Sequence, residues 1–109
     1  MPNPIVTLTR CCDYSRPGTA EAIERHFDLL GGLKQFVRPG DSVLLKPNFI
    51  APRSPKHAAQ TDPAVILETA RLLKDFGARP FVERPQTRTT TSTCVKALKL
   101  DEPLKKLSV

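Results

Sequence analysis

Short runs of β-branched and apolar residues alternate along this chain with segments of helical periodicity. The runs at 5–9, 43–45 and 80–82 each have the composition of a β-strand. A segment with helix signals follows each of them, which makes the order strand, helix, strand, helix, strand, helix. Alternation of this kind predicts a parallel sheet with right-handed crossovers. The expected fold class is α/β, a small βαβαβα unit with a three-stranded, mainly parallel sheet.

The ends of the first two helices carry recognisable capping signals. Thr19 is expected to cap the first helix, which stops at the glycine pair 31–32. Asp62 is expected to cap the second, with Pro63 at the first helical position and Gly77 at its end. A weaker third helix is expected around 92–98. We interpret Thr19, Asp62 and Gly77 as structural caps.

Length and composition restrict the class of protein. The 109 residues suit one α/β domain, and 39% hydrophobic with 26% charged residues excludes a disordered or membrane-spanning chain. The N-terminus shows no export signal and the three cysteines are an odd number, so we expect a cytoplasmic protein with reduced thiols. A three-stranded sheet would have open edges, which indicates an incomplete domain.

The basic residues suggest where a ligand would bind. The formal net charge is +6, which favours an acidic partner. Aromatic residues make up only 6% and tryptophan is absent, which argues against base stacking with nucleic acid. Open parallel sheets bind ligands beyond the carboxyl ends of their strands. The candidate ligand-binding residues at those ends and in the following loops are Arg10, Lys46, Asn48, Arg53, His57, Arg84 and Arg88.

These residues predict a crevice for an anionic small molecule, although ordinary loop solubility explains the same charges. No glycine-rich phosphate loop, nucleophile elbow or zinc motif appears, so no catalytic residue or metal site is assigned. The adjacent Cys11 and Cys12 lack the spacing of a metal knuckle or of an iron–sulfur run. We therefore expect no cofactor in this chain.

The strand end Lys46-Pro47-Asn48, in this setting, resembles the family catalogued as domain of unknown function 362. Members of that family are often joined to ferredoxin-like iron–sulfur modules. The similar features are Leu30-Gly31-Gly32-Leu33, Pro39-Gly40-Asp41, Lys46-Pro47-Asn48, Thr61 with Pro63, Gly77-Ala78 and Leu100-Asp101-Glu102. Two positions depart from the family pattern: Asp62 replaces a histidine, and the turn at 83–87 lacks glycine.

The resemblance implies that residues 1–109 are the N-terminal part of a larger domain. A [4Fe-4S] cluster is implied only for longer members, and the partner would be the C-terminal family region or the iron–sulfur module. The expected function is the anion- or small-molecule-binding portion of an iron–sulfur-linked redox protein, not catalytically complete alone. The alternatives are a non-catalytic binding or assembly module and an inactive remnant with a basic surface.

Overall fold

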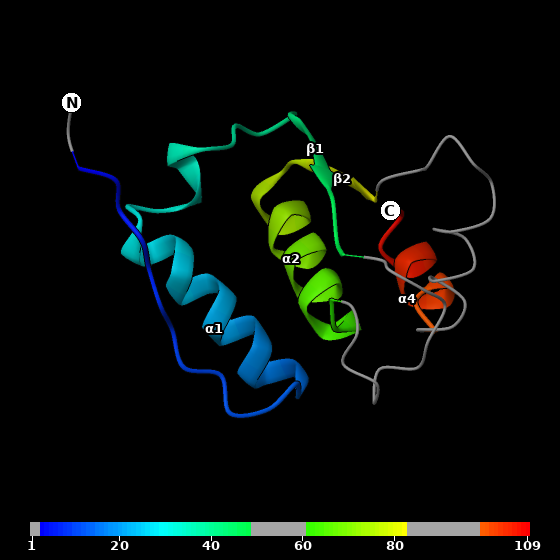
Figure 1. Ribbon diagram of the computed structural model, residues 1–109. Coiled ribbons are helices and arrows are strands. Elements are labelled where there is room, and N and C mark those ends of the chain that lie inside the picture. Colours follow the sequence, from blue (N-terminus) through cyan, green and yellow to red (C-terminus); the bar gives the residue numbers. More distant parts are fainter. Residues whose placement is uncertain (1–2, 49–60, 83–98) are drawn as a thin grey trace.

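The computed structural model describes residues 3–48, 61–82 and 99–109, and the arrangement of their helices and strands is shown in Figure 1. Helix α2 lies between α1 on one side and the strands with α4 on the other (Figure 1). The expected third helix, at 92–98, lies outside the described residues. The elements in chain order are α1 (Arg16–Leu29), the short 3-10 helix η1 (Leu33–Gln35), β1 (Ser42–Leu45), α2 (Pro63–Phe76), β2 (Arg79–Val82) and α4 (Asp101–Lys106).

The sheet consists of β1 and β2, which run parallel with α2 as the connection between them. The register pairs Ser42 with Arg79 and Leu45 with Val82. The α/β class is therefore confirmed, whereas the prediction of three strands is wrong for the described part of the chain, where the sheet has two.

The segment 5–9 is the predicted strand that does not form. It contains no strand residue, and Val6 and Leu8 are 90% and 93% exposed. It lies along α1 (Figure 1), where the Thr7 hydroxyl and His26 Nδ1 are 2.8 Å apart and the Thr9 hydroxyl donates to the Ala22 carbonyl. The β-branched composition favours an extended backbone, but a strand also needs the hydrogen bonds of a neighbour. The described residues provide no such neighbour for this segment.

The start of α1 also differs from the sequence prediction. The helix begins at Arg16 with Ser15 at the N-cap, and Thr19 lies inside it, where its amide donates to the Ser15 carbonyl. Thr19 is therefore not the cap. Pro17 explains the difference, because proline in a first turn loses no intrahelical hydrogen bond and its fixed φ suits the helix.

Both ends of α2 are held by local hydrogen bonds. The Asp62 carboxylate accepts from the Ala64 amide at 2.9 Å. Gly77 has a φ of 98°, the left-handed conformation in which glycine carries no Cβ penalty, and the Ala78 amide returns to the Leu73 carbonyl. These bonds set the length of the helix that connects the two strands.

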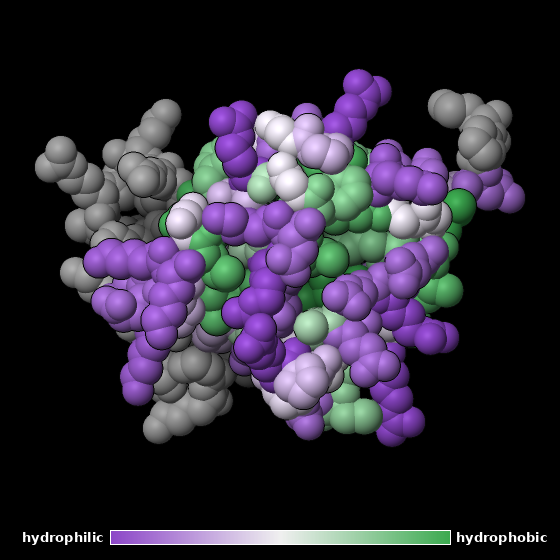
Figure 2. Space-filling model, turned by 180° about the vertical axis from the view of Figure 1, so that it is seen from behind, coloured by the Kyte–Doolittle hydropathy of each residue, from purple (hydrophilic) through white to green (hydrophobic). Residues whose placement is uncertain are grey.

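Helix α2 contributes to both hydrophobic clusters of the core. In one, Leu73 packs with Leu33 and Ala78, next to Phe27 of α1. In the other, Ile66 packs with Leu100 and Leu104. Seen from behind, hydrophobic residues reach the surface at the middle of the molecule between hydrophilic side chains (Figure 2).

The two long helices are also joined by charged groups. Glu68 of α2 is 6% exposed and forms ion pairs with Arg71 of the same helix and with Arg16 of α1. A buried carboxylate requires such partners, because removing an unpaired charge from water is strongly unfavourable.

Candidate functional site

A pocket of about 260 Å³ lies where β1 ends and α2 begins, and we call it the β1–α2 pocket. It lies beyond the carboxyl end of a strand in a parallel sheet, the position at which α/β proteins bind ligands. Its lining residues are Leu44, Leu45, Lys46, Pro47, Thr61, Val65, Ile66 and Thr69.

A pair of hydrogen bonds holds the two sides of this pocket together. The Asn48 amide donates to the Thr61 hydroxyl oxygen at 2.9 Å, and the Thr61 amide donates to the Asn48 carbonyl at 3.1 Å. The two residues lie on either side of the segment 49–60. Their pairing brings Lys46 and Pro47 to the first turn of α2.

The pocket combines an apolar wall with a cation at its rim. Leu45, Val65 and Ile66 supply hydrocarbon surface, while Lys46 is exposed. The Thr69 hydroxyl donates to the Val65 carbonyl, so its proton is already used within α2. Such a pocket can bind a small molecule that has an anionic group and an apolar body.

The electrostatics at the start of α2 are mixed. A helix N-terminus attracts anions through its dipole and its amide groups. Asp62 places a carboxylate at the same end and accepts from the Ala64 amide. The attraction for an anion therefore depends on Lys46 and the helix dipole outweighing Asp62.

Two of the sequence-predicted ligand residues, Lys46 and Asn48, lie at this site. Asn48 contributes through its backbone amide and carbonyl. Arg53, His57, Arg84 and Arg88 lie outside the described residues.

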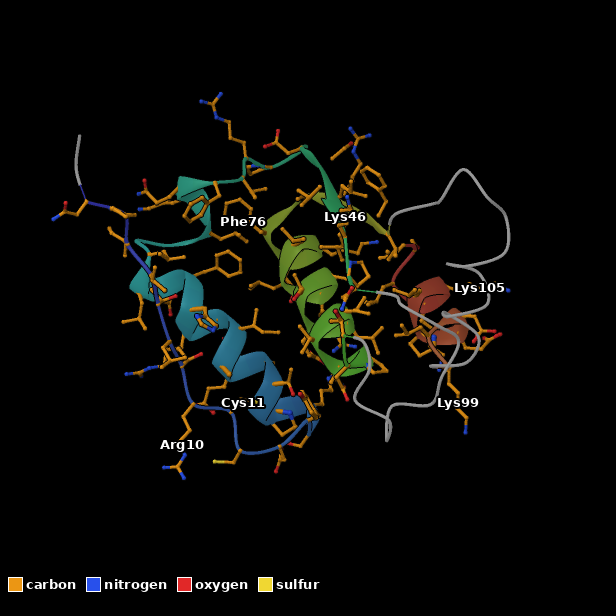
Figure 3. All side chains as sticks on the ribbon, viewed as in Figure 1. Arg10, Cys11, Lys46, Phe76, Lys99 and Lys105 are labelled. Atoms are coloured by element: carbon orange, nitrogen blue, oxygen red, sulfur yellow. The ribbon has the colours of Figure 1, made fainter. Side chains whose placement is uncertain are left out.

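Arg10 does not join them. It lies near the N-terminal end of α1, on the other side of α2 from Lys46 (Figure 3), and lines a separate hollow with Cys11, Cys12 and Arg25. The prediction placed Arg10 at the rim of the sheet because it placed 5–9 in the sheet. Since that segment lies along α1, Arg10 at its end is not at the edge of the sheet.

The hollow beside Arg10 is ordered by hydrogen bonds within the turn that precedes α1. The Cys11 thiol donates to the Asp13 carbonyl at 3.0 Å. The pKa of the Asp13 carboxyl is lowered because the Ser15 side chain and then the Ser15 amide hydrogen-bond to it. These contacts shape the turn before α1.

The sequence did not identify the lining residues on the α2 side of the pocket, which are Thr61, Val65, Ile66 and Thr69. Thr61 directly precedes the helix start at Asp62-Pro63, so its position next to that helix could be predicted from the sequence. Its bond to Asn48 links residues 13 apart and has no local signal.

The cysteines of this chain do not fit a [4Fe–4S] cluster held by one chain. Such a cluster uses four cysteine thiolates, and the whole chain has three cysteines. Within the described ranges, no group of three or more histidine, cysteine or acidic side chains is arranged to hold a metal ion.

Two parallel strands connected by a helix form a βαβ unit, the building block of α/β folds, and a pocket lies at the carboxyl end of its first strand. The sequence model of the family described as Domain of unknown function (DUF362) matches residues 43–109. The chain belongs to this family, which confirms the resemblance found in the sequence.

A curated relative is similar over part of the chain. It is the Thylakoid-associated protein sll1697 of Synechocystis sp. (strain ATCC 27184 / PCC 6803 / Kazusa), 35% identical over 77 residues. The match covers 71% of this chain and 24% of the relative, so the chain corresponds to about a quarter of that protein. No solved structure matches the chain. Among the described helices, none is long and apolar enough to cross a membrane.

Proposed function

We propose that this chain is the anion-binding N-terminal portion of a longer protein, and that the β1–α2 pocket receives the ligand. The ligand is a small carboxylate or phosphate ester with an apolar body. Lys46 pairs with its anionic group, and the wall formed by Leu45, Val65 and Ile66 contacts the remainder. The chain is not catalytically complete alone.

The observation that carries this proposal is the pairing of Asn48 with Thr61. It fixes the strand end that bears Lys46 against the start of α2. Positioning a charged side chain on an ordered strand end reduces the entropy lost when a ligand is bound.

Replacing Lys46 with alanine is expected to weaken ligand binding about tenfold or more, because a hydrogen bond to a charged group contributes about 1.5–3 kcal/mol. The measurement is a thermal-shift screen with sugar phosphates and carboxylic acids, followed by calorimetric titration of any hit. Ligand-dependent stabilisation should be lost in Lys46→Ala.

Arg10→Ala is the matched control, because it also removes one exposed cation but lies at the other hollow. It should leave the affinity within about twofold if binding follows position rather than net charge. Equal losses of affinity in both variants would show that binding depends on the net charge of the chain and not on Lys46. If no ligand stabilises the chain, the alternative of an inactive remnant would be favoured.

Replacing Asp62 with asparagine is expected to strengthen anion binding by about two- to fivefold, since one charge near a helix end changes the energy by about 0.3–1 kcal/mol. Asparagine is as good an N-cap as aspartate, so helix α2 should keep its stability. Calorimetric titration at low and high salt measures the gain, which should shrink with salt. Weaker binding in this variant would mean that Asp62 contacts the ligand directly.

Any redox step belongs to the rest of the longer protein in this proposal. The iron–sulfur module of longer family members would hold the cluster, and the present chain would supply ligand binding, in the cytoplasm. The relative supports this separation of ligand binding from the remaining functions, because the match covers 24% of its length and most of that protein lies outside the matched region.

A further inference from the structure

The outer face of the β1–β2 sheet is an apolar surface that the described helices leave uncovered. Along each strand the burial alternates: Val43 and Pro80 are covered, whereas Leu44 and Phe81 are exposed. Leu44 also lines the edge of the β1–α2 pocket. Leu44 and Phe81 are register partners, 47% and 46% exposed. Neither hydrophobic cluster includes them.

The sequence of the strands is that of a sheet covered on both faces. Parallel sheets occur almost always between two layers of helices, and their strands are continuously apolar. The run 43–45 and the run 80–82 have this composition. The inner face has its cover, since α2 and α4 pack there through Ile66 and Leu104.

We propose that the outer face of this sheet is the docking surface for an amphipathic helix from the part of the longer family domain that this chain lacks. The family match runs through residue 109, and the relative extends well beyond the matched region, which covers 24% of it. The part of the relative outside the match is long enough to supply a second helical layer.

The chemistry of the surface specifies the helix. Leu44 and Phe81 require an apolar stripe. Arg79 lies on the same face, two residues before Phe81, and its guanidinium donates to the Gly40 carbonyl at 3.2 Å. A carboxylate beside the apolar stripe would complement this charge, as polar rims surround apolar interface centres.

The experiment uses a full-length chimera in which this chain replaces the matching segment of the Synechocystis relative. Hydrogen exchange of the backbone amides of residues 42–45, 79, 81 and 82 is compared between the chimera and the 109-residue chain alone. Covering the outer face should slow their exchange at least about tenfold in the chimera. A chimera that exchanges at the same rate as the isolated chain, or that does not fold, overturns the proposal.

Phe81→Lys tests the face directly, with Leu29→Lys as its control at the half-exposed end of α1. In the chimera Phe81→Lys should lower the melting temperature by about 5 °C or more relative to the control. In the isolated chain the two variants should behave alike. Should Phe81→Lys prevent the chimera from folding, Phe81→Leu, which retains an apolar side chain, should still fold and show slow exchange.

Two other results would contradict this assignment. If the isolated chain dimerises in sedimentation and Phe81→Lys makes it monomeric, a second copy covers the face. If Phe81→Lys and Leu29→Lys destabilise the chimera equally, the face is not buried there. The test does not alter Lys46, so ligand binding at the β1–α2 pocket is measured separately.

Discussion

Leu73→Ala is expected to lower the free energy of unfolding by about 3 kcal/mol, within the range of about 2–5 kcal/mol found for buried leucines. Leu73 is buried in the cluster with Leu33 and Ala78, where α2 meets η1 and the start of β2. The substitution removes three carbon atoms and leaves a cavity between these elements. Urea unfolding followed by circular dichroism measures the change.

This loss is a large part of the total free energy of unfolding, which is about 5–15 kcal/mol for a typical domain. Leu29→Ala is the control, because Leu29 is half exposed at the end of α1. It should cost less than about 1 kcal/mol. Equal effects of the two substitutions would show that the cluster around Leu73 is not packed in solution.

Arg71→Ala is expected to destabilise the chain by about 2–3 kcal/mol, because it removes the main partner of a buried carboxylate. Glu68 is 6% exposed, and Arg71, at 30% exposure, is its hydrogen-bonded neighbour one turn along α2. Without Arg71 the carboxylate keeps, among the described residues, the ion pair with Arg16 at 3.7 Å. Chemical unfolding at neutral pH measures the change.

Two companion variants separate charge from packing. Arg16→Ala should cost less than about 1 kcal/mol, because Arg16 is 71% exposed and its ion pair is weakened by solvent. Glu68→Met should cost less than Arg71→Ala, because the arginines that it leaves without a carboxylate are partly exposed and reach water, whereas Arg71→Ala leaves the buried carboxylate without its nearest cation. If Arg71→Ala remains as costly in the Glu68→Met background, the loss comes from the packing of the arginine and not from its charge.

The fold could be predicted from sequence where the signals are local. Asp62 and Gly77 bond to groups within a few residues, and they mark the ends of α2 as expected. The start of α1 was misplaced because Thr19 and Pro17 both resemble helix starts. Proline is tolerated in the first turn of a helix, so Pro17 is compatible with the observed start of α1 at Arg16.

The candidate site was predictable only in part. Lys46 at the end of an apolar strand was identified from the general rule that ligands bind at strand ends. Its neighbours could not be identified, because the bond between Asn48 and Thr61 joins residues 13 apart. Arg10 was placed at the same site through a strand at 5–9 that does not form.

The sequence by itself determined both ends of α2 and the end of α1, because capping bonds and helical periodicity involve residues close along the chain. The tertiary structure decided which apolar runs became strands, since a strand requires the backbone of a distant neighbour. Residues 43–45 find that neighbour in β2. Residues 5–9, which are richer in β-branched residues, lie along α1 instead, with Val6 and Leu8 exposed.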